Sequence, residues 1–313
     1  MTHAVDCGYY PGWVRKCITF SIDGGNVPMD EIFLSYARPA GIRGTFNLCP
    51  DHMELLPDAA AYRAFYRGYE ISNHVRHHPF AFEDGREYVI AEEPFEEASA
   101  DEGKIYPTDV EHLYRIHRPN GWRPLADTEG YIAFADESRQ ALEAVFGEGT
   151  IGGFVWPFTE QKNAALRAHL ENAGYYGLRR GMSVKEPWAD RFPFPPEPMR
   201  WMYTANHTNL LTQAQKYEAL PDDGERKFFC IGVHSIDYES AGKWDDFARF
   251  CREFGCRPGT YWYASVGEIF AADAAARSLI ITEDSVTNPS DTAVYLTVDG
   301  IRRIADAHTT LRL

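Results

Sequence analysis

The chain has 313 residues, 44% of them hydrophobic, so it can bury a large core as one α/β domain or as two smaller ones. Its 46 acidic and 31 basic side chains give a formal net charge of -15, which disfavours nucleic acid and anionic lipid as partners. The N-terminal residues do not resemble a signal peptide, and no run approaches the ~18 apolar residues of a membrane span. Six cysteines without a C-x-x-C pair are typical of reduced thiols, so we expect a cytoplasmic protein.

The first 80 residues alternate predicted strands and helices. Segments rich in β-branched and aromatic residues indicate the strands, and apolar positions on one face indicate the helices. This alternation is typical of parallel βα units, whose ligands bind at the carboxyl ends of the strands. The expected strands are 16–22, 44–49 and 69–73, and the expected helices are 30–40 and 58–67.

Residues 83–132 interrupt the alternation. They are acidic at first and then aromatic, and about fifty residues without a clean period are long for a loop. We therefore predict an insertion with short strands of its own. Its aromatic side chains suit either a wall for a sugar or a small core within the insertion.

The alternation returns after the insertion and gives way to β-like sequence near the C-terminus. We predict a main body over 1–276 and a small β-appendage over 277–313, since 37 residues are too few to stand alone as a domain. In the second half of the main body the expected strands are 152–158, 175–180, 227–233 and 260–264, and the expected helices are 136–146, 160–173, 212–220, 243–254 and 266–276.

A group of histidines follows the strand at 69–73. His74 and His78 stand four residues apart, with His77 between them and Pro79 after them. Imidazoles at i and i+4 lie on one side of a helical turn, and neutral imidazole is a ligand for zinc and other divalent transition metals. Three surface histidines in a turn would give the same pattern, so the rest of the chain decides between the two interpretations.

Five segments together resemble a known family. They are I-T-F-S-I-D-G-G at 18–25, G-I-R-G-T-F-N-L at 41–48, E-I-S-N-H-V-R-H-H-P at 70–79, G-F-V-W-P-F at 153–158 and I-G-V-H-S at 231–235. In this order they resemble the motifs of polysaccharide deacetylases (carbohydrate esterase family 4), in a branch whose first motif is similar to T-F-S-F-D-D-G. The resemblance implies a distorted (β/α) barrel. It also implies metal-dependent removal of an N- or O-linked acetyl group from a carbohydrate or a similar small amide or ester.

The resemblance also implies roles for individual residues. His74 and His78 match the two metal-binding histidines, although a one-residue bulge would exchange His78 for His77. His234 matches the general acid that protonates the leaving group. The implied metal is zinc, with cobalt, nickel or manganese as alternatives, and the implied partner is an oligosaccharide or small-molecule substrate, with a homo-oligomer allowed. The residues that match the wall of the acetyl pocket are Trp156, Pro157 and Phe158, which would equally suit a plain core.

The first motif departs from the family pattern, which has two adjacent aspartates where this chain has Asp23 and Gly24. Aligned on the preceding T-F-S, Asp23 is the catalytic base and Gly24 replaces the metal-binding aspartate. In that register we expect Gly24→Asp to complete the site. Shifted by one residue, Asp23 is the metal ligand and Ile22 stands where the base belongs.

A second departure concerns the arginine that many family members place before the prolines of the third motif. Val155 and Trp156 stand at that place in this chain. Since two expected side chains are missing, the alternative function is a catalytically inactive barrel that binds a saccharide or a protein partner.

Overall fold

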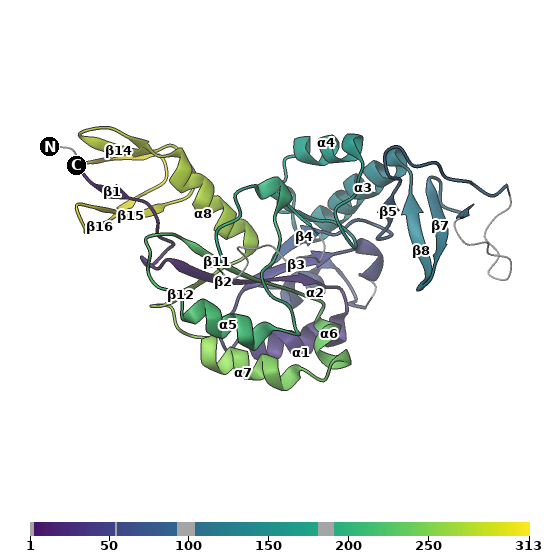
Figure 1. Ribbon diagram of the computed structural model, residues 1–313, viewed down its shortest axis with the longest axis horizontal. Helices are drawn as coiled ribbons and strands as arrows, with labels where there is room; N and C mark the ends of the chain where they lie inside the picture. The colour runs from purple at the N-terminus through teal and green to yellow at the C-terminus, as the bar shows by residue number, and fades with distance from the viewer. Residues whose placement is uncertain (1–2, 54, 93–103, 181–190) are drawn as a thin grey trace.

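A parallel sheet forms the centre of the fold (Figure 1). The computed structural model describes residues 3–53, 55–92, 104–180 and 191–313. The sheet comprises β2 (Lys16–Asp23), β3 (Gly44–Leu48), β4 (Glu70–Asn73), β9 (Gly153–Val155), β10 (Gly177–Arg179), β11 (Lys227–Val233) and β12 (Tyr261–Tyr263). The strand order is β10-β9-β4-β3-β2-β11, with β12 paired to β2.

The gap between the first and last strands of this order is spanned by residues 201–205. Trp201 forms a parallel bridge to Arg179 of β10, and Ala205 forms one to Ile231 of β11. Single bridges thus close the sheet into an irregular barrel. The predicted α/β class and the distorted (β/α) barrel are confirmed.

Helices pack around this sheet, and many begin where the sequence supplies a cap. The side chains of Asn26, Asp58, Asp127, Asn163 and Ser265 each accept a hydrogen bond from a backbone N–H of the first turn. The helices are α1 (Val27–Ala37), α2 (Ala59–Phe65), α3 (Thr128–Phe146), α4 (Ala164–Asn172), α5 (Leu210–Glu218), α6 (Ser235–Ser240), α7 (Trp244–Phe254) and α8 (Val266–Ser278), with short 3₁₀ turns at Pro50–His52 and Pro198–Arg200. In the described part of the chain, none of them is long and apolar enough to cross a membrane.

Two helices differ from the prediction. Because Asp127 caps α3, that helix begins at residue 128, eight residues earlier than expected, and it takes in the last part of the predicted insertion. Helix α6 was not predicted, since six residues are too few to show a period.

The main core lies between the sheet and helices α1, α5 and α7. All seven residues of β11 are buried, as expected for a parallel strand covered on both faces. Aromatic rings fill the space: Phe33 stacks on Phe247 with centroids 4.6 Å apart, and Phe20 contacts Phe33 at 5.3 Å. This packing fixes the strands whose ends carry the candidate site.

The region predicted as an insertion contains a second sheet at one end of the molecule (Figure 1). Three strands come from this region: β6 (Ile105–Pro107), β7 (Leu113–Arg118) and β8 (Gly121–Ala126). The fourth, β5 (Phe80–Ala81), lies just before the predicted start at residue 83, and the order is β5-β8-β7-β6. Residues 93–103 of this region lie outside the described residues.

The C-terminal strands lie at the opposite end (Figure 1). They are β13 (Ile280–Ile281), β14 (Ser285–Asn288), β15 (Val294–Val298), β16 (Ile301–Ala305) and β17 (Thr309–Arg312). They form two three-stranded sheets, one of which includes β1 (Val5–Asp6) from the N-terminus. These sheets enclose a small core against α8. The division of the chain at residue 276 remains a prediction, and the pairing of β1 shows that the appendage also uses the N-terminal segment.

Candidate functional site

Four predicted site residues meet at the carboxyl ends of the barrel strands. Asp23 ends β2, while His74 and His234 follow β4 and β11 directly. The Asp23 Oδ2 atom lies 3.9 Å from His74 Nε2 and 3.9 Å from His234 Nε2. His78 Nε2 lies 3.0 Å from His74 Nε2. All four line one hollow of about 310 Å³, so residues up to 211 positions apart share one site.

The two imidazoles meet through an irregular turn. The helical turn suggested by their spacing is not formed, because Val75, His77 and His78 have positive φ angles of 61°, 62° and 47°. His74 Nδ1 lies 3.0 Å from the Val155 carbonyl oxygen, and a hydrogen bond there places the proton on Nδ1. The Nε2 lone pair of His74 therefore faces His78 and Asp23.

His77 points away from this group. Its Nδ1 lies 2.9 Å from Asp51, its backbone N–H donates to the same carboxylate at 2.7 Å, and its ring meets Phe134 edge-on at 4.8 Å. The structure therefore places His78 rather than His77 beside His74.

Asp23 is a partly buried carboxylate, 16% exposed at its side chain, whose two oxygens have different surroundings. Its Oδ1 accepts hydrogen bonds from the Arg179 guanidinium and from Asn47 Nδ2, the latter at 2.8 Å, while Oδ2 faces the histidines. Burial disfavours the ionised form, but the positive charge of Arg179, supported by the nearby His74 and His234, outweighs it and holds the pKa of Asp23 well below its usual range. Asp23 is therefore ionised.

Arg179 is a site residue that the sequence analysis missed. It is 1% exposed, ends β10, and lies over the ring of Tyr203 at 5.4 Å. The arginine expected before Pro157 is absent, and an arginine from the neighbouring strand β10 lies beside Asp23 instead. The only sequence signal was an arginine at the end of a short predicted strand, and Arg180 beside it gave the same signal.

Asp237 was also missed. It is the third residue of α6, and its Oδ2 accepts from the His234 backbone N–H at 2.9 Å and lies 3.0 Å from His234 Nδ1. This contact, opposed by burial, raises the pKa of His234. The bond from the His234 backbone N–H to the acid three positions later corresponds to one half of a capping box.

Gly24 lines the open cleft that contains Asp23, His74 and His234, but its Cα hydrogens have close neighbours. A Cβ atom there would lie 2.7 Å from the Phe46 ring and 3.2 Å from Asp30 Oδ2, so a side chain would enter the packing below the site. An aspartate at Gly24 would therefore require the Phe46 ring to shift, and the expectation that Gly24→Asp completes the site stays a prediction. Asp30 itself is buried and accepts hydrogen bonds from Gly25 N–H, Tyr66 and Ser235, which ties the loop after β2 to the end of β11.

Two of the three residues predicted for the pocket wall line the hollow. Trp156 is 1% exposed and packs against Phe154 and Tyr131, but it also lines the hollow. Phe158 lines it too and meets the His78 ring edge-on at 4.6 Å. Pro157 is not among the described residues that line the hollow.

The donor set suits a divalent metal with two histidine ligands. Burial lowers the pKa of His74. Burial, together with the repulsion that a second protonated ring beside His74 would meet, lowers the pKa of His78 to about 3, so both imidazoles are neutral and can act as ligands. The third donor nearby is Asp23 Oδ2, which lies 3.9 Å from His74 Nε2. In the described ranges, no three His, Cys, Asp or Glu side chains are already arranged as a complete metal site. The residues thus fit a metal site with two imidazole ligands and the Asp23 carboxylate as a third donor.

Comparisons with known proteins give structural likeness only. No family model and no curated protein matches the chain. It is similar to the Xyl-CE4 domain of a multidomain xylanase from the hindgut metagenome of Trinervitermes trinervoides (12% identity, 83% of this chain and 92% of that chain, TM-score 0.47). It is also similar to the peptidoglycan deacetylase PdaC from Bacillus subtilis (15%, 84% and 95%, 0.43) and to a family 4 carbohydrate esterase from Streptomyces lividans in complex with acetate (14%, 77% and 91%, 0.42). At these identities and TM-scores, the activities of these proteins are not inferred for this chain.

Proposed function

We propose that the protein is a metal-dependent hydrolase that removes an N- or O-linked acetyl group from a carbohydrate or a similar small amide or ester. The observation that carries the proposal is the group of His74, His78, Asp23 and His234 at one end of the barrel. Two neutral imidazoles face an ionised carboxylate, and a histidine of raised pKa stands on the other side of that carboxylate. This is a set of metal ligands, base and acid in one place.

In this proposal His74 and His78 hold the ion, which is zinc or else cobalt, nickel or manganese. When bound, the ion polarises the acyl carbonyl and makes a water molecule easier to deprotonate. Asp23 Oδ2 accepts the proton of the attacking water, while Arg179 holds Oδ1 and keeps the carboxylate oriented. His234 Nε2 donates a proton to the leaving amine or alcohol, and Asp237 holds the other ring nitrogen.

The hollow beside these groups suits a small acyl group. Its walls include Trp156, Phe158 and Tyr203, which present apolar surface next to the histidines. We propose that the acetyl methyl lies against these rings, and that the protein acts in the cytoplasm on an oligosaccharide or another small molecule. A homo-oligomer remains a prediction.

A second candidate is a catalytically inactive barrel that binds a saccharide or a protein partner. It is supported by Gly24, which supplies no ligand, and by the incomplete metal arrangement among the described residues. Under this alternative the histidines would have no function in hydrolysis.

Metal retention separates the two candidates. Purified protein, dialysed against buffer containing zinc and then against metal-free buffer, should retain about one ion per chain by elemental analysis. His74→Ala and His78→Ala should lose it. His77→Ala is the matched control and should keep the ion, because His77 binds Asp51 instead. A wild type that retains no ion and releases no acetate from acetylated oligosaccharides would support the inactive barrel.

A further inference from the structure

The candidate base and the candidate acid stand on two chain segments that separate just beyond the sheet. Strands β2 and β11 pair in parallel as far as Ile22 and Val233, so Asp23 and His234 come directly after the last pair. From there one segment enters the loop 24–26 and the other enters α6. The strand pairing therefore brings the two side chains to the same edge of the sheet, but it does not fix the distance between the segments beyond that edge.

The bonds that orient the two side chains do not connect these segments. Asp237 lies three residues after His234 and contacts its Nδ1 at 3.0 Å, so this contact stays within one segment. Arg179 and Asn47 donate to Oδ1 of Asp23 from two other strands. Each of these contacts orients a ring or a carboxylate, and a connection between acid and base has to come from elsewhere.

The carboxylate of Asp30 bonds to both segments. It belongs to α1 and is fully buried. Its Oδ1 accepts a hydrogen bond from the Ser235 hydroxyl at 2.5 Å, and its Oδ2 accepts one from the Gly25 N–H at 3.0 Å. Ser235 follows His234 directly, and Gly25 follows Asp23 by two residues. One buried side chain thus connects the segment of the acid to the segment of the base.

Asp30 is itself held in a fixed position. The Tyr66 hydroxyl donates a third hydrogen bond, to Oδ2 at 2.8 Å, and Tyr66 is only 2% exposed. A Cβ atom on Gly24 would lie 3.2 Å from Asp30 Oδ2, so the backbone of the loop lies close to the carboxylate. The carboxylate therefore has little room to move relative to the loop.

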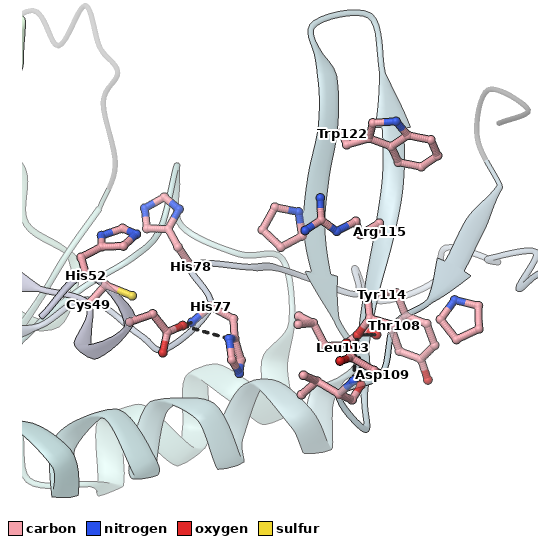
Figure 2. Close-up of a pocket in the computed structure, with 14 residues that line it drawn as sticks. Cys49, His52, His77, His78, Thr108, Asp109, Leu113, Tyr114, Arg115 and Trp122 are labelled. Atoms are coloured by element: carbon pink, nitrogen blue, oxygen red, sulfur yellow. Dashed lines mark hydrogen bonds and ion pairs between the residues drawn. The ribbon is translucent and has the colours of Figure 1, made fainter. Parts of the chain in front are cut away.

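The other side of the loop is covered by a histidine of the open cleft. A Cβ atom on Gly25 would lie 3.1 Å from His52 Cβ. Figure 2 shows His52 and His78 on the same side of the hollow that lies between the histidine turn and the inserted sheet. Gly25 has a φ angle of 101°, which a glycine adopts without strain. The loop is thus enclosed between Asp30 and the cleft, so a displacement of Asp30 would reach the candidate site.

We propose that Asp30 is a positioning residue, which through Ser235 holds His234 at the distance from Asp23 that protonation of the leaving group requires. This inference rests on the proposed function for the roles of Asp23 and His234. Asp30 is not among the described residues that line the hollow or the open cleft, so it acts through its neighbours. Because a displacement of about 1 Å at a reacting group can cost about 10²-fold in rate, the loss of one bond should be measurable.

The test compares two substrates that differ in their need for an acid. The amine released from tetra-N-acetylchitotetraose must be protonated as it leaves, whereas 4-nitrophenolate leaves 4-nitrophenyl acetate without a proton. Ser235→Ala removes the hydrogen bond on the acid side, so kcat on the saccharide should fall about 10-fold and KM should change less than about twofold. The rate on the nitrophenyl ester, corrected for the rate of His74→Ala, should equal that of the wild type.

Tyr66→Phe is the matched control. It removes one hydrogen bond from the same carboxylate and leaves the bonds from Ser235 and Gly25 in place. A merely structural role of Asp30 would make the two variants alike. We expect instead that Tyr66→Phe keeps wild-type kcat on both substrates, with zinc retention equal to that of the wild type in both variants.

A double variant tests whether Ser235 acts through Asp30. In the Asp30→Ala background, Ser235→Ala should have no further effect, because the bond that it removes is already absent. A further loss of about 10-fold in that background would show that Ser235 acts without Asp30, and it would overturn the inference. Should Asp30→Ala fail to fold, the comparison of Ser235→Ala with Tyr66→Phe decides by itself.

Hydrogen exchange gives a readout that does not depend on activity. The amides of the loop 24–26 and of residues 235–237 should exchange faster in Ser235→Ala than in the wild type, and at the wild-type rate in Tyr66→Phe. A wild type without His74-dependent hydrolysis of either substrate would overturn the proposed function, and with it the role of Asp30. A hydrolase whose Ser235→Ala variant keeps wild-type kcat on the saccharide, or loses both substrates equally, would overturn this inference alone.

Discussion

At the scale of single residues, the two oxygens of Asp23 give it two possible roles. Oδ1 is bound by Arg179 and Asn47, and Oδ2 faces the histidines at 3.9 Å. An arginine on one oxygen suits a base that must remain ionised and oriented. A free oxygen near two imidazoles equally suits a metal ligand, so the geometry leaves the two sequence registers to experiment.

Asp23→Asn distinguishes the registers. If Asp23 is the base, the variant should lose about 10²–10⁴ in kcat, because the amide cannot accept the proton of water. Metal content should stay within a factor of two of the wild type. These quantities are measured by acetate release and elemental analysis on the same sample. Loss of the metal together with the activity would show instead that Asp23 is a ligand. Asp51→Asn is the control. It removes another carboxylate beside the histidine turn, one that binds Arg76 and His77.

At the scale of elements, the strands that carry the motifs were predictable and the pairing between them was not. The buried run at 227–233 and the alternation at 16–22 were expected as strands and are β11 and β2. The joint placement of Asp23 and Arg179 depends on β10 and β2 curving round the barrel, which no local pattern records. The histidine turn was misjudged because i, i+4 spacing implies a helix only when φ is negative throughout.

Helix α6 matters for the chemistry because its first turn holds the candidate acid. Asp237 raises the pKa of His234 because its carboxylate accepts a hydrogen bond from the Nδ1–H group of that ring. A histidine that acts as an acid is active below its pKa and inactive above it. In Asp237→Asn the pKa of His234 should fall, so the alkaline limb of kcat/KM should move to lower pH.

A pH profile of kcat/KM checks this shift. Asp246→Asn is the control, because Asp246 in α7 accepts a hydrogen bond from Lys243 Nζ and is not among the residues that line the candidate site. An unchanged alkaline limb in Asp237→Asn, with the fold intact by circular dichroism, would show that His234 is not the group that titrates.

At the scale of the whole molecule, the barrel that carries the candidate site has an added sheet at each end (Figure 1). The inserted sheet and His78 line one hollow of about 680 Å³, whereas the C-terminal sheets contact α8 and the N-terminal strand and have a core of their own. Trp13 Nε1 donates to the Leu296 carbonyl oxygen at 3.2 Å, and Asp299 binds the backbone N–H of Ala4 at 2.9 Å. These bonds join the N-terminus to the appendage and do not involve any site residue.

Leu296→Ala tests whether the appendage is energetically separate from the site. Leu296 is fully buried in the small core, so its truncation should cost about 2–5 kcal/mol of the stability of the C-terminal sheets. Hydrogen exchange should show faster exchange for the amides of β14 to β17 and unchanged protection in β2 and β11. Ile304→Ala is the matched control, because Ile304 is 38% exposed on the same sheet and should change stability by less than about 0.5 kcal/mol. Zinc retention at His74 and His78 should equal that of the wild type in both variants. A fall in zinc retention in Leu296→Ala alone would mean that the C-terminal sheets support the barrel ends that carry the site.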